Sequence, residues 1–338
     1  LLFLQIALND GKLEDARTII KDLLGKSPSS SAEVRAAAGY LAYQEGNGPR
    51  ALTECQKAGS TAFAEWTTGL VFSRSGECEK AAAAFQRARA GSFVFHWQQV
   101  AALNSAARAV EEGGETETAL ALYKEAFHIA PLHPQTSSNL MVFHWSRNKL
   151  PNAAAYAELL ELRTEDPLLR VLLNEYQNDS VAARNELKAR MENSSRTRTP
   201  FEKKVVVIPD FALIGCLPAL SGTGCAAAGY LRKSLEGNQG MVVINRSLIK
   251  ETAKISAFEV LLDTPARLRS AATAAGGNVL VLGEVAAYED SYLINVRVGD
   301  VRTGEIGAVF SHKFSVLDEV APVLDQAAGQ IMQHLKVQ

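Results

Sequence analysis

Residues 39–58 read Gly39-Tyr-Leu-Ala-Tyr-Gln-Glu-Gly46-Asn-Gly-Pro-Arg-Ala51-Leu-Thr-Glu-Cys55-Gln-Lys-Ala58. Small residues at these intervals let two antiparallel helices approach closely, and Gly46 supplies the turn between them. The same series recurs in three other registers, which predicts a row of helix pairs: Gly11, Ala16, Ile20, Leu23 and Pro28; Gly69, Gly76, Ala81, Phe85 and Ala88; Gly114, Ala119, Tyr123, Ala126 and Pro131.

This series resembles the tetratricopeptide repeat (TPR). The resemblance implies an α-solenoid of about five or six TPR-like helix pairs over residues 1–192, with the first helix of each pair lining a concave groove. Two of these pairs are degenerate. One spans residues 134–166, where Ala153 is kept but Asn148 stands at the turn, and the other is the short stretch 167–192.

The pattern changes in the second half of the chain. Residues 193–203 are polar and carry Pro200, which predicts a linker. From Lys204 the order of the expected elements is strand, helix, strand, two helices, three strands and a final helix. The short connections between the last three strands predict an antiparallel meander. Residues 204–338 are therefore expected to form an α/β domain with a mixed sheet.

The α/β half resembles the amino-terminal domain of TolB and the related CsgG-like and FlgO-like domains of bacterial envelope proteins. The segments that carry the resemblance are Val205-Val-Val-Ile-Pro-Asp210, Gly222-Thr-Gly224, Val242-Val-Ile-Asn-Arg246, Val281-Leu-Gly283-Glu284-Val285 and Asp300-Val-Arg-Thr-Gly-Glu305. Such domains mainly bind other proteins and share no catalytic set. The resemblance therefore implies an extracytoplasmic binding role, and the chain departs from the pattern in the loop that contains Cys216, Pro218 and Cys225.

The charge balance and hydropathy exclude two classes of protein. The chain of 338 residues has 35 basic and 37 acidic side chains, and the net charge of −2 lacks the basic character of a general nucleic-acid binder. No apolar stretch approaches the roughly 20 residues that a transmembrane helix needs. Because Leu1 already lies in an apolar helical pattern, we expect a targeting segment or further chain before it.

The sequence favours a non-enzymatic protein without cofactor or metal. The segment Gly222-Thr-Gly224-Cys-Ala-Ala227 fits a relaxed G-x-G-x-x-A dinucleotide pattern. However, about a dozen residues separate Pro209 from Gly222, whereas the glycines of a Rossmann unit follow the strand directly. A tight turn into a helix is the favoured interpretation, and a nucleotide site is the alternative. The six His residues show no metal-ligand spacing.

The four cysteines form two local pairs. Cys216 and Cys225 bracket a loop short enough for a disulfide to close, so this bridge is a candidate, and an oxidising compartment would follow from it. Free thiols are the alternative. Cys55 and Cys78 belong to neighbouring helix pairs, where buried free thiols are expected.

The register of the repeats predicts which side chains project into the groove. Aromatic, Arg and Asn side chains suit an extended peptide or a partner helix. The alternative is that some of the aromatics fill contacts between repeats instead. The predicted groove residues are Tyr40, Tyr43, Trp66, Leu70, Arg74, Asn104, Arg108, Asn139 and Trp145.

These patterns together predict a protein-interaction and assembly protein of the bacterial envelope: periplasmic, outer-membrane-associated or extracellular. Its partners would be proteins or peptides, and a homo-oligomer is expected. The first alternative is a self-assembling subunit of a surface filament or ring, in which successive copies pack head to tail. The second alternative is a nucleotide-binding or enzymatic domain.

Overall fold

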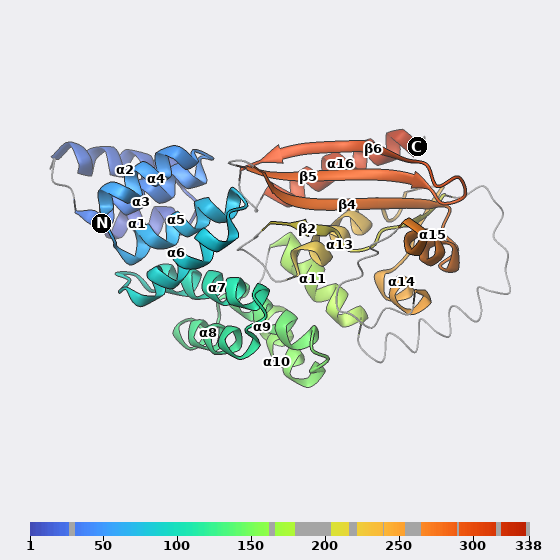
Figure 1. Cartoon of the computed structure of the whole chain (residues 1–338), viewed down its shortest axis with the longest axis horizontal. Coiled ribbons are helices and arrows are strands. Elements are labelled where there is room, and N and C mark those ends of the chain that lie inside the picture. Colours follow the sequence, from blue (N-terminus) through green and yellow to red (C-terminus); the bar gives the residue numbers. More distant parts are fainter. Residues whose placement is uncertain are drawn as a thin grey trace.

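A computed structural model describes residues 1–26, 31–161, 166–179, 204–215, 222–238, 240–253, 265–288, 291–315 and 319–335. It confirms the predicted fold class: an α-solenoid of TPR-like helix pairs is followed by an α/β domain with a mixed sheet (Figure 1). The helices of the first half are α1 (Leu2–Asn9), α2 (Leu13–Lys26), α3 (Ala32–Gln44), α4 (Gly48–Ala58), α5 (Ala62–Arg74), α6 (Cys78–Ala90), α7 (His96–Glu112), α8 (Thr116–Ile129), α9 (Pro134–Trp145), α10 (Leu150–Glu161) and α11 (Pro167–Asn178).

Small residues set the distance between the two helices of a pair. A Cβ atom added at Gly69 would lie 2.5 Å from the ring of Phe85, and one at Gly39 would lie 2.6 Å from Cys55 Sγ. Only glycine permits these contacts. The turns between the paired helices use a left-handed residue, which is glycine in four pairs and Asn148 (φ 55°) in the fifth. The predicted repeat register is therefore confirmed.

The α/β half contains one strand more than expected. Its elements are β1 (Lys204–Val207), β2 (Ala212–Ile214), α13 (Thr223–Leu235), β3 (Met241–Val243), α14 (Arg246–Thr252), α15 (Pro265–Ala274), β4 (Val279–Tyr288), β5 (Ser291–Asp300), β6 (Ile306–Phe314) and α16 (Val320–Leu335). The strand order is β3-β1-β4-β5-β6, with β2 also paired to β4. β1 lies parallel to β3 and β4, whereas β4, β5 and β6 form the predicted antiparallel meander.

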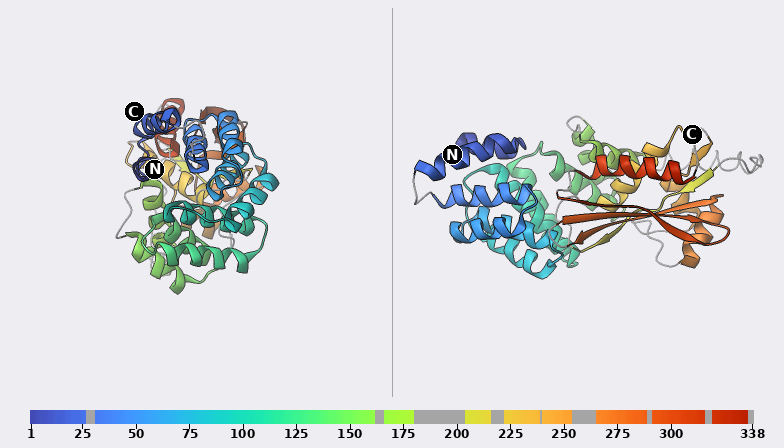
Figure 2. Two further views of the ribbon diagram at one scale, coloured as in Figure 1. Left: turned by 90° about the vertical axis from the view of Figure 1, so that its left-hand side faces the viewer. Right: turned by 90° about the horizontal axis from the view of Figure 1, so that it is seen from above.

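Helices cover the two faces of the sheet unequally. α13 and α16 pack on one face, where Val281, Ile294 and Leu324 belong to the main core of this half. α14 and α15 cover part of the other face through a smaller cluster that includes Val207, Ile249 and Leu280. The view from above in Figure 2 shows α16 along one side of the long strands β4 to β6. Much of the opposite face of these strands carries no helix (Figures 1 and 2).

The two halves pack against each other in two places. α11 lies on α13, and Gly229 permits this approach because a Cβ atom there would be 2.6 Å from Val171 Cγ1. At the second place, two inter-helix turns of the solenoid meet the sheet, and a Cβ atom at Gly46 would be 2.6 Å from Ser315 Oγ. The expected linker at residues 193–203 lies outside the described residues. The division into residues 1–192 and 204–338 stays a prediction.

Candidate protein-interaction site

Four aromatic rings meet between the first helices of the second, third and fourth pairs. Tyr40 stacks on Trp66 with their ring centroids 5.3 Å apart, and Phe63 meets Trp97 edge to face at 5.7 Å. Trp66 and Trp97 are also in edge contact at 6.1 Å. Aromatic pairs at these distances stabilise a packed interior beyond the area that they bury. Tyr40 and Trp66, which were expected to line an open groove, therefore fill the inside of the solenoid together with Phe63 and Trp97.

Polar side chains of α5, α7 and α9 satisfy one another in the same interior. Trp66 Nε1 donates to Ser105 Oγ at 3.1 Å. Asn139 Nδ2 donates to Asn104 Oδ1 at 3.1 Å, and Asn104 Nδ2 donates to Thr136 Oγ1 at 2.8 Å. Buried polar groups need such partners, because an unpaired group loses its hydrogen bonds to water. This ladder uses much of the hydrogen-bonding capacity that a bound peptide would otherwise engage.

The solenoid curls tightly enough for α1 to reach α7. Gln98 Nε2 donates to Gln5 Oε1 at 2.9 Å, and both side chains are buried. The expected exposure of the groove is therefore wrong, and the alternative that the aromatics fill contacts between repeats describes the structure. Partner binding through these residues stays a prediction that now requires the helix pairs to open. Only Arg108 keeps partial exposure, whereas the buried members of the set are Tyr40, Tyr43, Trp66, Leu70, Arg74, Asn104, Asn139 and Trp145.

Arg74 joins the solenoid to the sheet. Its guanidinium lies 4.4 Å from the centre of the Tyr43 ring, and its Nη1 donates to Tyr43 O at 2.8 Å. The same nitrogen donates to Ser315 O at 3.2 Å, just beyond the end of β6. The side chain is fully buried. Arg74 therefore acts between the two halves of the chain and not on an accessible groove.

A buried charge network occupies the junction formed by α11, α13 and α14. Arg246 Nη2 donates to Asp210 Oδ2 at 2.8 Å, and Arg232 Nη2 donates to Glu175 Oε1 at 2.9 Å. Asp179 Oδ2 accepts from Trp145 Nε1 at 3.1 Å. Figure 1 shows α11 between the solenoid and the α/β half. Glu175 belongs to α11 and Asp179 follows it. The pair of Arg232 with Glu175, and Arg246 Nη1 at 3.6 Å from Asp179 Oδ2, therefore tie the solenoid to the α/β half.

The sequence contained only an indirect sign of this network. Asp210 and Arg246 each end a segment on which the resemblance to TolB-like domains rests, but no contact between them was expected. Charged residues just after short strands are normally solvated. Here both are buried: Asp210 lies 3.9 Å from Arg232 of α13, and Arg246 lies 3.6 Å from Asp179, which follows α11.

The Gly222–Gly224 turn has a packing role. Gly222 has φ +81°, and a Cβ atom at Gly224 would lie 2.3 Å from the carbonyl oxygen of Phe211. Phe211 N donates to Gly224 O at 3.1 Å, so the start of α13 is fixed against the chain that leads into β2. These contacts explain why both positions are glycine: the chain enters α13 through a tight turn. This turn is the interpretation that the sequence favoured.

The described cysteines are free thiols. Cys225 is buried, and its burial raises the pKa of the thiol well above its usual value. Cys216 lies outside the described residues, but the free thiol of Cys225 contradicts the predicted bridge between the two. Burial alone protects Cys225 from alkylation. An alkylation test for the bridge therefore has to be carried out in denaturant and without reductant. Cys55 is buried as expected, and burial raises its pKa to about 12, whereas Cys78 is exposed, contrary to expectation.

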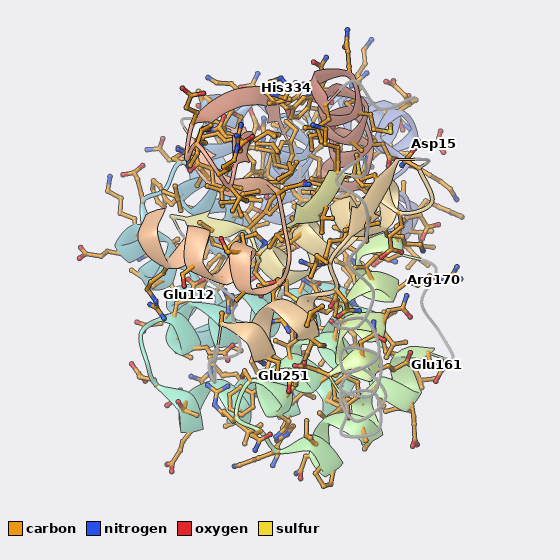
Figure 3. All side chains as sticks on the ribbon, turned by 90° about the vertical axis from the view of Figure 1, so that its right-hand side faces the viewer. Asp15, Glu112, Glu161, Arg170, Glu251 and His334 are labelled. Carbon is orange, nitrogen blue, oxygen red and sulfur yellow. The ribbon has the colours of Figure 1, made fainter. Side chains whose placement is uncertain are left out.

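One described hollow lies at the far end of the sheet. Its volume is about 640 Å³, and Lys204, Asp300 and His334 line it. Figure 3 shows His334 near the top of the view onto this end of the molecule. Backbone N–H groups of Thr303 and Arg302 donate to Asp300 and hold the pKa of this carboxyl low. Within the described ranges, no group of three or more His, Cys, Asp or Glu side chains could hold a metal ion.

Comparisons with known proteins found similarity only among solved structures. No family model and no curated protein matches the chain. PilF from Pseudomonas aeruginosa is 15% identical, with a TM-score of 0.42, and the match covers 58% of this chain and 95% of that protein. PilW, described as a type IV pilus biogenesis factor, is 16% identical with a TM-score of 0.42, and the match covers 58% of this chain and 93% of that protein. Escherichia coli LpoB is 16% identical at a TM-score of 0.27 and covers 32% and 54%.

Among the helices that the structure describes, none combines the length and the apolar character needed to cross a bilayer.

Proposed function

We propose that the chain is a non-enzymatic protein-interaction and assembly factor of the bacterial cell envelope or exterior. One observation supports this most strongly: α11 and the buried charge network join the solenoid to the α/β domain, through Arg232 with Glu175 and through Arg246 and Lys250 with Asp179. The surfaces of both halves are then presented to partners in a fixed arrangement. A preorganised surface loses little conformational entropy when it binds, which favours a scaffold role.

The face of β4 to β6 that α13 and α16 leave open is the surface that we assign to a protein partner. Its polar side chains hold one another in place. Asn295 Nδ2 donates to Glu284 Oε1 at 2.7 Å, and Ser311 Oγ donates to Asn295 Oδ1 at 2.7 Å. Arg297 lies 3.4 Å from Glu284 and is half exposed. Arginine and ordered polar side chains on an exposed sheet can recognise the surface of a partner without further folding.

Photo-crosslinking in the native cells tests this assignment. A photoreactive residue at Ser311 should yield a discrete protein adduct in the envelope fraction, and the substitution Arg297→Glu should weaken it about tenfold. A photoreactive residue at Gln86, which is exposed on α6, serves as the matched control. Adducts of equal strength from both positions, or a Ser311 adduct insensitive to Arg297→Glu, would argue against this face. Recovery of the protein in the cytoplasmic fraction alone would contradict the proposed location.

A further inference from the structure

Helix α9 has a histidine at each end. His133 is the residue before the helix, and His144 lies in its last turn. α9 packs on α8 and α10, and it also contacts α7 and α11 (Figure 1). The protonation of these two rings therefore bears on how the helix is held among its neighbours.

The ring of His133 accepts hydrogen bonds at the start of α9. Thr136 N donates to His133 Nδ1 at 3.4 Å, and Thr136 Oγ1 lies 3.0 Å from the same ring nitrogen. A ring nitrogen accepts only through its lone pair, so Nδ1 carries no proton in the folded chain. This contact caps the helix, because it satisfies an N–H group that has no partner within the helix.

The same threonine connects the cap to the interior of the solenoid. Asn104 Nδ2 donates to Thr136 Oγ1 at 2.8 Å, and Asn139 Nδ2 donates to Asn104 Oδ1 at 3.1 Å. The hydroxyl hydrogen of Thr136 then points to His133 Nδ1. A proton on Nδ1 would set it against two donors of Thr136. The ladder that joins α7 to α9 would have to rearrange.

His144 is held neutral for a different reason. The residue is 4% exposed, its ring stacks on Tyr156 of α10 with the centroids 5.8 Å apart, and its Nδ1 has no hydrogen-bond partner in the described part of the chain. Glu111 of α7 pairs with Arg147 at 3.2 Å and not with the histidine. A proton on this ring would be buried, unpaired and close to like charges. The described charged groups that act on the ring are all cations: Lys149, Lys124 of α8 and Arg147.

Both histidines have a lowered pKa. Desolvation lowers the pKa of His133, and no charged group of the described residues contributes to this shift. Desolvation, and after it the three cations, lower the pKa of His144. In an opened chain a histidine takes up its proton near its ordinary pKa of about 6.5. The packing of α9 is therefore fully stable above about pH 6.5, and stability is lost as the pH falls from there towards the lower pKa values of the folded chain.

We propose that α9 is an acid-sensitive joint of the solenoid: His133 and His144 take up protons as the pH falls, and the helix is released from α7, α8 and α10. Release at the His133 end breaks the ladder between α7 and α9 that fills the interior. Release at the other end frees Trp145, whose Nε1 donates to Asp179 at the junction with the α/β half. Acid thus opens the interior and loosens the junction through one helix. The joint does not depend on the partner assigned to the face of β4 to β6.

Hydrogen–deuterium exchange of the full chain measures this release. From about pH 7.5 to about pH 5.5, the protection of the α9 amides should fall by at least roughly tenfold after correction for the pH dependence of intrinsic exchange. Protection in α5, a first helix without histidine, should stay within about twofold. Circular dichroism at neutral pH should show the same helix content for the parent and for each variant below.

Two variants connect the release to the two rings. In His133→Asn/His144→Phe, Asn keeps a capping oxygen and Phe keeps a ring against Tyr156, but neither side chain takes up a proton. This double variant should lose the acid response of α9. His96→Asn, at an exposed position at the start of α7, is the matched control and should keep it.

Each other outcome overturns the proposal. Constant protection of α9, or an equal loss in α5 and α9 of the parent chain, would show that acid does not act on this helix in particular. A double variant that responds as the parent does, or a control that loses the response, would show that the two rings are not the cause. The comparison of α5 with α9 uses the parent alone, so it decides the matter even if the double variant does not fold.

Discussion

Replacement of Arg246 by Met should lower the free energy of unfolding by about 3–5 kcal/mol. Arg246 is 1% exposed, and its Nε and Nη2 donate to Asp210 at 2.9 and 2.8 Å. Removal of the guanidinium leaves a buried carboxylate without its main countercharge, which is far more costly than loss of a surface ion pair. Urea unfolding followed by circular dichroism measures the change.

Two further variants make this result specific. Arg297→Met removes the half-exposed pair with Glu284 and should cost less than about 1 kcal/mol. The double variant Arg246→Met/Asp210→Leu removes both charges and should recover part of the loss, because no buried carboxylate then remains unpaired. A cost for Arg246→Met no larger than that for Arg297→Met would show that the buried pair contributes little to the stability of the protein.

Replacement of Gly224 by Val should cost about 3 kcal/mol or more. A Cβ atom there would lie 2.3 Å from a backbone oxygen, that of Phe211, and backbone cannot move away as the end of a flexible side chain can. The start of α13 and the chain before β2 would have to separate, with loss of the hydrogen bond from Phe211 N to Gly224 O. Thermal unfolding measures the effect.

Gly329 provides the matched control for this prediction. It lies in α16, and a Cβ atom there would meet nothing within 4 Å. Gly329→Ala should therefore stabilise the protein by up to about 1 kcal/mol through helix propensity. If Gly224→Val were tolerated as well as Gly329→Ala, the close approach at Gly224 would be refuted and a ligand-related role for this turn would regain weight.

The helix pairs could be predicted from sequence because their cause is local. Gly39 and Gly69 lie where two helices cross, and the small residue is needed whatever the rest of the chain does. The same holds for the alternation along β5, where Tyr292, Ile294 and Val296 are buried. β2 was missed because it has only three residues, Ala212–Ile214. A strand of this length is too short to show an alternation of buried and exposed side chains.

The closed groove could not be predicted because its cause is not local. Helical periodicity shows which face of a helix is apolar, but the rotation from one repeat to the next depends on packing between distant residues. Gln5 and Gln98 meet only once several pairs have stacked. The junction network has the same origin, because it joins residues far apart in the sequence: Arg232 pairs with Glu175, and Arg246 lies 3.6 Å from Asp179. A charged residue in a loop gives no sign of such a distant partner.

Cleavage of the chain between its halves tests the central claim, that α11 and the charge network hold the solenoid and the α/β domain together. A specific protease site placed between Ser195 and Arg196, in the predicted linker, allows a single cut in the folded protein. Size-exclusion chromatography at physiological salt should then show the two fragments eluting together, and Arg232→Met, which removes the buried ion pair with Glu175 across the cut, should make them separate. Fragments of the parent chain that elute apart immediately after the cut would contradict the account.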